Sequence, residues 1–221
     1  MRNGLSLLIL LLFFVAEGVA AAPTRHDVEL WVELQPIAGE PDPAPISRDE
    51  AARRLLEEAR FVFSGMLYGF EFRYVPFDRE RGVAEEFVLN PVAEIPWGAD
   101  QLTILDIRHE ENLMYGRMRY TLAAHEETRR DAWARSSVKR ASGSGSAPRI
   151  LGTGAKQNAI EDALRNAVHE YLRARVYNKP HEVSGRLVLS AAPRVILRSG
   201  EYQATVQVKL VIQDLRSYAV Y

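Results

Sequence analysis

The chain has 221 residues, of which 47% are hydrophobic and 26% are charged, and this ordinary globular composition excludes a disordered chain, a collagen-like chain and a multi-span membrane protein. The 28 Lys and Arg residues against 29 Asp and Glu residues give a net charge of -1, so a strongly basic protein that binds nucleic acid is not expected. The absence of cysteine from the sequence excludes disulfides, a thiolate nucleophile and a thiolate metal site.

The N-terminus has the layout of a secretory signal peptide. Arg2 precedes an apolar run from Leu5 to Val15, and small residues ending at Ala20 follow this run. The run is shorter than the roughly 20 apolar residues that a membrane-spanning helix needs. We therefore predict a cleaved signal peptide over residues 1–20, a mature chain without a transmembrane anchor, and a periplasmic or outer-membrane-associated location.

Residues 21–128 form the first of two predicted α+β halves. Residues 26–34 alternate between apolar and polar side chains, as a half-buried strand requires. Ser47 and Glu50 form a capping box, which predicts the start of an amphipathic helix. Further strands are predicted over residues 86–89, 102–108 and 113–123.

Four aromatic residues alternate along one strand after this helix, namely Tyr68, Phe70, Phe72 and Tyr74. Such a row can form a stacking platform for sugars or bases. Because the row follows an amphipathic helix that needs a surface to cover, we interpret it as part of the hydrophobic core.

Residues 129–148 are predicted to form a flexible basic linker between the halves. The segment from Arg129 to Lys156 contains seven cations and the single acid Asp131, and its centre contains only Ala, Ser and Gly. We predict that these cations bind a partner, either an acidic envelope protein or an anionic envelope polymer, and the alternative is a solvated loop. The predicted partner-binding residues are Arg129, Arg130, Arg135, Lys139, Arg140, Arg149 and Lys156.

Residues 149–221 form the second predicted half, which starts with the clearest helical pattern in the chain. Alanine recurs there every four residues, at Ala155, Ala159, Ala163 and Ala167. Small side chains let a helix lie close to a sheet, so we expect the alanine series to pack against the sheet that carries Val206 and Val208, with Ala163 at the closest approach. Strands are predicted over residues 183–189, 194–198 and 202–213. The predicted fold is α+β, with two amphipathic helices packed on a mainly antiparallel sheet.

The sequence contains no clear catalytic or metal-binding motif. Each histidine precedes an acid, but none has the His-Glu-x-x-His spacing that places two ligands on one helix face. A Gly-x-Ser-x-Gly nucleophile motif is also absent. We predict no catalytic residue, no metal ligand and no cofactor, and the alternative is a catalytic group assembled from distant residues. Gly152-Thr153-Gly154 is similar to a phosphate-binding turn, but we favour a tight turn in which Thr153 caps the next helix.

The second half resembles a known small exported α+β domain. Gly152-Thr-Gly-Ala155 precedes the alanine series, and residues 200–208 form a strand with an early tyrosine. Over residues 148–213 this pattern is similar to the domain at the front of the flagellar T-ring protein and in related small outer-membrane lipoproteins. The resemblance implies a non-enzymatic envelope or flagellar assembly component, although this chain lacks the lipoprotein cysteine.

Together these features predict an exported, non-enzymatic binding or assembly component of the bacterial cell envelope, with a flagellar association implied by the resemblance. The alternative function is an envelope hydrolase or a metal-dependent enzyme. An enzyme needs His, Asp or Glu side chains that converge in a pocket, whereas an assembly component presents an exposed edge or a basic face.

We expect the exported protein to begin near Ala21, because the small residues before it suit signal cleavage. Intact-mass measurement on protein recovered from the cell envelope checks this. A species that retains Met1 and sediments with membranes would show that the segment is an anchor.

Overall fold

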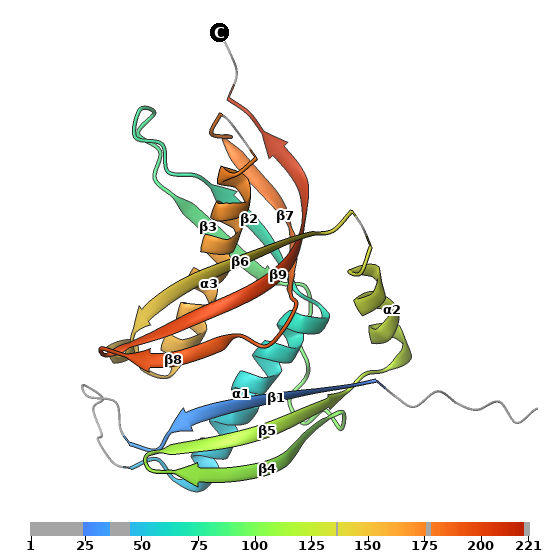
Figure 1. Ribbon diagram of the computed structural model, residues 1–221, viewed down its shortest axis with the longest axis vertical. Helices are drawn as coiled ribbons and strands as arrows, with labels where there is room; N and C mark the ends of the chain where they lie inside the picture. Colours follow the sequence, from blue (N-terminus) through green and yellow to red (C-terminus); the bar gives the residue numbers. More distant parts are fainter. Residues whose placement is uncertain (1–23, 36–44, 136, 176–177, 219–221) are drawn as a thin grey trace, which may run out of the picture.

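Figure 1 shows the computed structural model of the protein, which describes residues 24–35, 45–135, 137–175 and 178–218. The predicted signal peptide, residues 1–20, lies outside the described residues. The helices are α1 (Arg48–Leu67), α2 (Ala124–Ala132) and α3 (Ala155–Arg173), and a short 3₁₀ segment, η1 (Arg149–Gly154), precedes α3. The strands are β1 (Arg25–Glu33), β2 (Phe70–Val75), β3 (Glu86–Pro91), β4 (Leu102–Glu110), β5 (Leu113–Thr121), β6 (Lys139–Pro148), β7 (Glu182–Leu189), β8 (Arg194–Arg198) and β9 (Glu201–Arg216).

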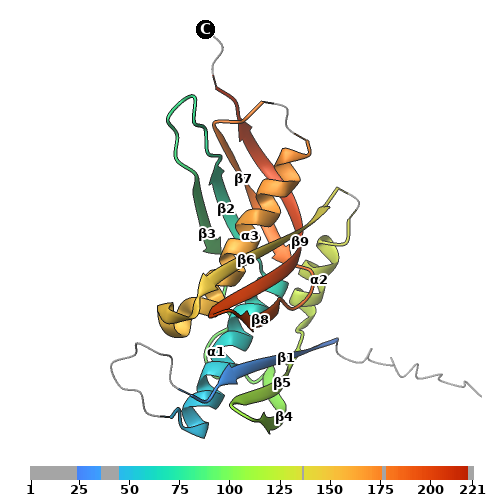
Figure 2. The same cartoon turned by 60° about the vertical axis from the view of Figure 1, so that its left-hand side comes forward.

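The strands form two sheets. The smaller sheet has the order β1-β5-β4, and the larger sheet has the order β3-β2-β7-β9-β6 with β8 also paired to β9. The strand pairs in both sheets are antiparallel. Helix α1 packs on the smaller sheet and α3 on the larger one, as the two views in Figures 1 and 2 show. The predicted α+β class, with helices packed on mainly antiparallel sheet, is therefore confirmed.

Helix α1 begins where the sequence predicts. The hydroxyl of Ser47 accepts a hydrogen bond from the backbone N–H of Glu50 at 3.1 Å, which satisfies one of the free N–H groups of the first turn. The Glu50 carboxylate does not complete the capping box, because it binds the side chains of Arg53 and Arg54 instead. The opposite face of α1 is buried against β1 and β5.

The aromatic row on β2 belongs to the second core. Phe70, Phe72 and Tyr74 are almost fully buried together with the apolar face of α3, which confirms their interpretation as core residues. Tyr68 lies outside the strand, at the C-terminal end of α1, and its hydroxyl donates to the carboxylate of Glu126. The row thus supports packing of α3 on the larger sheet.

The first predicted half and the second, once β6 from the predicted linker is added to it, share an order of elements and also share a sheet. Each half begins with a strand and a helix and ends with a hairpin, which is β4–β5 in the first half and β8–β9 in the second. The last strand of the hairpin pairs with the strand that begins the half, so β5 pairs with β1 and β9 pairs with β6. Strand β2 of the first half pairs with β7 of the second half, with Phe72 opposite Gly185. The larger sheet therefore contains strands from both halves and joins them.

The prediction of a flexible linker over residues 129–148 is wrong. Its first residues belong to α2, and residues 139–148 form β6, which is paired with β9 along its whole length. The composition of Ala, Ser and Gly suggested a flexible chain. Along the strand, however, residues without a polar side chain alternate strictly with serines, so that each type lies on one face. Small residues face α3, whereas the serines face outward: Ala141, Gly143, Gly145 and Ala147 alternate with Ser142, Ser144 and Ser146.

Glycine at two positions of β6 is required by the close approach of α3. A Cβ atom built on Gly143 would overlap the backbone of Ala163 and would lie 2.9 Å from the Cα atom of Ala167. A Cβ atom on Gly145 would lie 2.6 Å from the backbone carbon of Asp162. The alanine series on α3 is fully buried against the sheet that carries Val206 and Val208, as predicted, and the close approach of Ala163 is to β6.

Replacing Gly143 by Ala is expected to lower the free energy of unfolding by about 1 to 3 kcal/mol, because the added methyl group has no space. The sign is informative, since Gly to Ala within an unhindered strand stabilises by roughly 0.5 to 1 kcal/mol. Urea unfolding measures the change. Ser142→Ala on the outward face is the matched control, with an expected change within about 0.5 kcal/mol. Equal stability of Gly143→Ala and the original protein would contradict the tight packing of β6 on α3.

Candidate binding face

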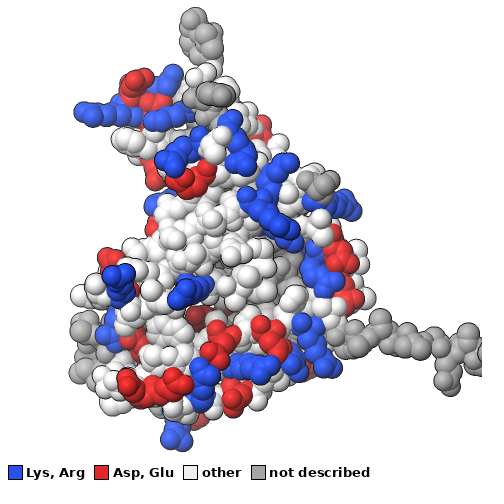
Figure 3. All heavy atoms as spheres, viewed as in Figure 1, with Lys and Arg blue, Asp and Glu red and all other residues white. Residues whose placement is uncertain are grey.

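The larger sheet has one face covered by α3 and one face that is largely uncovered. We call the part formed by β6, β9 and β8 the open face. Figure 3 shows it as a mostly uncharged band with a few separate cations, between two more highly charged zones. Its outward side chains are Arg140, Ser142, Ser144, Ser146, Arg194, Ile196, Arg198, Glu201, Gln203, Thr205, Gln207 and Lys209.

The centre of the open face consists of uncharged polar side chains in regular rows. Ser142 lies opposite Gln207, Ser144 opposite Thr205, and Ser146 opposite Gln203. The hydroxyl oxygens of Ser144 and Thr205 are 3.3 Å apart. A shallow hollow of about 510 Å³ lies over this part of the sheet, and Arg194 contributes to its lining. The rows therefore offer hydroxyl and amide groups as both hydrogen-bond donors and acceptors.

Two cations lie directly opposite each other at one end of the open face. Arg140 on β6 is paired in register with Lys209 on β9, and both side chains point outward. In the described part of the chain, no carboxylate lies within ion-pair distance of either cation. Like charges directly opposite in a sheet are destabilising. The pair therefore opposes folding of the free protein and favours a bound anion.

The free edge of β6 is closed by side chains from α3. The Asp162 carboxylate accepts a hydrogen bond from the backbone N–H of Ser146 at 3.1 Å. The Asn166 amide donates to the backbone carbonyl of Ser144 at 2.7 Å. These bonds occupy backbone groups that another strand would need. A ligand is thus directed to the side chains of the open face and not to the edge of β6.

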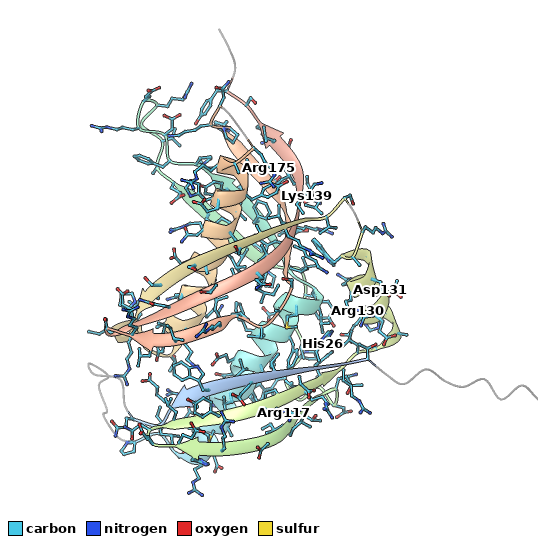
Figure 4. The ribbon with its side chains drawn as sticks, in the orientation of Figure 1. His26, Arg117, Arg130, Asp131, Lys139 and Arg175 are labelled. Carbon is cyan, nitrogen blue, oxygen red and sulfur yellow. The ribbon has the colours of Figure 1, made fainter. Side chains whose placement is uncertain are left out.

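The predicted basic residues separate into two groups. Figure 4 labels Arg130 and Asp131 on α2, and Lys139 at the start of β6, on the same side of the ribbon. The first group comprises Arg129, Arg130, Arg135, Lys139 and Arg140, on α2, on the turn that follows it and on the first two residues of β6. Of this group, Arg130 pairs with Asp131 at 2.9 Å.

The second group lies beyond the opposite end of β6, where the chain enters α3. Arg149 pairs with Glu33 at 3.1 Å, and the same carboxylate accepts a hydrogen bond from the Tyr202 hydroxyl. Lys156 is only 8% exposed. Arg149 and Lys156 therefore do not share one basic surface with the other five cations.

Lys156 joins the two halves through a buried ion pair. Its ammonium group lies 3.2 Å from the Glu58 carboxylate, donates to the backbone carbonyl of Trp31, and sits 3.6 Å from the centre of the Trp31 indole ring. Burial raises the pKa of the Glu58 carboxyl and lowers the pKa of the Lys156 amine, and in each case the partner's charge opposes the shift. The contacts assign Lys156 to the junction, and its prediction as a surface residue is wrong.

The turn before α3 lines a pocket of about 280 Å³ at this junction. Gly152, Thr153 and Gly154 form one wall, opposite Glu58 of α1. The N-cap of α3 is Gly154 and makes no side-chain hydrogen bond, so the prediction that Thr153 caps the helix is wrong. Gly152 has a φ of 83°, which accounts for the glycine at the kink.

The remaining polar clusters are structural. Glu126 is buried, and its carboxylate accepts hydrogen bonds from the hydroxyls of Tyr68 and Tyr120 and from the backbone N–H of Ala123, which fixes the start of α2. Among the described residues, no group of three His, Asp or Glu side chains is placed to hold a metal ion. No described helix has the length and apolar character needed to cross a membrane.

Sequence reasoning found Arg140 but missed the surface to which it belongs. Lys209, Arg194 and the outward Gln and Thr residues of β9 were not predicted as site residues, because each is an ordinary solvated position on its own strand. The signal that could have found the face is the strict alternation of serine with small residues over residues 141–147. That alternation predicts a strand with one tightly packed face and one polar face.

Comparison with known proteins gives a family and one relative. The model of one protein family matches residues 17–218. The chain is 27% identical over 195 residues to a Treponema pallidum (strain Nichols) protein described as "Uncharacterized protein", and the match covers 88% of this chain and 82% of the relative. No solved structure matches significantly. The matched region includes both sheets and the open face.

Replacing Lys156 by Met is expected to destabilise the protein by about 3 to 5 kcal/mol, because it leaves the Glu58 carboxylate buried without a counterion. Adding Glu58→Gln should restore most of that loss, since the amide carries no charge. Thermal and urea unfolding of the two variants measure both effects. Lys139→Met removes an exposed cation as the control and should change stability by less than about 0.5 kcal/mol. A Lys156→Met protein as stable as the original would contradict the junction role.

Proposed function

We propose that this chain, which belongs to the family whose model spans residues 17–218, is a non-enzymatic binding component of the bacterial cell envelope. Its open face binds an anionic envelope polymer. The observation that carries the proposal is the opposed pair Arg140 and Lys209 beside the uncharged rows of the open face. The periplasmic or outer-membrane-associated location and the flagellar association remain parts of this proposal.

The shape of the open face suits an extended polymer. Residues 140–146 of β6 span about 20 Å at the usual rise of a strand. Along this length a polymer meets hydroxyl and amide groups from Ser144, Thr205 and Gln207, and it meets cations at Arg140 and Lys209. A chain that carries both hydroxyl and carboxylate or phosphate groups can satisfy both kinds of contact. An anionic glycan has this chemistry.

The same face is less suited to an acidic protein. The centres of protein interfaces are rich in aromatic side chains and poor in serine. On the open face the exposed large apolar side chain is Ile196, at 41% exposure, and serines occupy three of the central positions. The composition therefore favours a polar, hydrated polymer over a packed protein surface.

The face also lacks the groups that hydrolysis requires. A hydrolase of glycans normally uses two carboxyl groups on either side of the bond that breaks. Among the described residues, Glu201 is an outward carboxylate in the end row opposite Arg198, and Asp162 of α3 lines the hollow from the edge of β6. Asp162 already accepts a hydrogen bond from the backbone N–H of Ser146 and helps to close that edge. A binding role, in which the polymer is held unchanged, therefore fits the open face better than the alternative of an envelope enzyme.

Binding is tested by sedimentation of the purified protein with isolated cell-wall sacculi, which are insoluble anionic glycans, after protease treatment has removed attached proteins. We expect binding that weakens steeply as salt rises past about 0.15 M, where charges are screened beyond roughly 8 Å. A soluble polyanion should compete, and a neutral dextran should not. Binding that is lost after protease treatment would show that the partner is an acidic protein and would overturn the proposal.

Changing Lys209 to Glu should weaken this binding and also stabilise the free protein. The substitution replaces a repulsive cross-strand pair with Arg140 by an attractive one, and we expect about 0.2 to 1 kcal/mol of added stability. Sedimentation and urea unfolding measure the two opposite effects. The control removes two positive charges elsewhere, with Arg25→Gln and Arg79→Gln, and should leave binding nearly unchanged. Loss of binding in the control as well would mean that only the net charge matters.

A further inference from the structure

The free edges of the two sheets are protected to very different degrees. At β1, the carbonyl of Trp31 accepts from Lys156, and at β8 the carbonyl of Val195 accepts from the indole N–H of Trp31 at 3.2 Å. The edge of β6 is closed by Asp162 and Asn166. Strand β3 has six residues and ends in Pro91, which has no N–H to offer a neighbour.

The edge of β4 has none of these protections in the described part of the chain. Strand β4 has nine residues and pairs only with β5 among the described strands. It is longer than the edge strands β3 and β8, and side chains contact the backbone of the other two edge strands, β6 and β1. Three neighbouring apolar side chains are exposed on β4, with Ile104 at 37%, Leu105 at 41% and Ile107 at 38%. A strand edge with unpaired backbone groups and exposed apolar side chains can pair with another strand, and the charges that β4 also carries then decide which strand fits.

We infer that β4 is a dimerisation edge, at which two copies of this chain pair their β4 strands antiparallel and join their smaller sheets. The partner is a second copy because the edge is complementary to itself. Ile107 and Ile104 point to the side of the sheet covered by α1, whereas Asp106 and Arg108 point to the other side. A two-fold axis perpendicular to the sheet keeps these faces together.

Among the registers in which the two β4 strands overlap over most of their length, one satisfies the charges of the edge. With the two-fold axis at Ile107, this residue lies opposite Ile107 of the second copy. Asp106 of each copy then lies opposite Arg108 of the other copy, which gives two pairs of opposite charge. An axis at Asp106 would oppose two aspartates, and an axis at Arg108 would oppose two arginines. An axis at His109 would also pair Arg108 with Glu110, but the strands would then overlap only over residues 108–110, because β4 ends at Glu110. Cross-strand pairs of opposite charge stabilise a sheet, and like pairs destabilise it. The sequence of β4 therefore selects the axis at Ile107.

The groups that this register needs are accessible. In the described residues Asp106 has no cation within 4.0 Å, because its cross-strand neighbour Arg117 pairs with Asp27 at 3.0 Å. Arg108 contacts Glu29 and Glu110, and its side chain is still 48% exposed. The irregularity of β4 falls between Ile104 and Asp106 and leaves residues 106–110 in regular pairing with β5. The central pairs of the proposed dimer thus lie on regular strand.

The test is sedimentation velocity on the full protein and on charge-exchange variants. The original chain should sediment as a dimer. Asp106→Arg and Arg108→Asp should each weaken dimerisation about tenfold or more, because two attractive pairs become repulsive in each variant. An equal mixture of the two variants should dimerise again, since each Arg then faces an Asp, and the double variant should also dimerise.

The matched control is Asp131→Arg, the same charge reversal on α2, which should leave the dimer unchanged. A monomeric original protein at every concentration tested would overturn the inference. A dimer that survives both single variants would place the interface elsewhere and would also overturn it. If the single variants are monomeric but their mixture does not associate, the proposed register is wrong. The restored mixture shows that both single variants fold.

Discussion

The close contact between β6 and α3 is the constraint on which the rest of the second half depends. Backbone lies against backbone there, so β6 can carry only glycine and alanine on its inner face. Because the strand is fixed by this contact and by its ladder with β9, its outward positions become a rigid surface. Serine at those positions is compatible with an exposed strand and adds hydroxyl groups at regular intervals. The packing requirement on one face therefore creates the polar open face on the other.

The junction between the halves rests on a different balance of forces. Strand β2 pairs with β7 through backbone hydrogen bonds, which hold the larger sheet together across the halves. Lys156 adds a buried charge whose desolvation is offset by Glu58, by a backbone carbonyl and by the Trp31 ring. Such a buried ion pair contributes little net stability compared with apolar packing. A different arrangement of the two halves would leave Lys156 or Glu58 buried without its counterion, and this costs free energy. The halves are thus fixed relative to each other by the shared sheet and by a specific contact.

The sequence predicts elements well where a single periodicity decides them. The cap at Ser47, the alanine series of α3 and the strand over residues 202–213 each follow from local spacing, and each is found with small changes at its ends. The β6 segment was mispredicted because Gly and Ser have low strand propensity, and only the tertiary contact with α3 makes them suitable. Lys156 was misplaced for a similar reason. Its surroundings, Glu58 and Trp31, are distant in the chain, so no local pattern could show that the cation is buried.

The open face and the β4 edge each contain a local arrangement that is unfavourable in the free protein. In other places charged side chains pair across strands, as Asp27 does with Arg119, and side chains of α3 close the edge of β6. Arg140 and Lys209 instead oppose each other, and β4 leaves apolar side chains exposed. Local conflicts of this kind persist where function requires them. The two conflicts differ in chemistry, since unpaired cations call for an anion and an uncapped edge calls for a strand. They therefore point to two separate contacts, one on each sheet, and binding at the open face does not require the β4 edge to be paired.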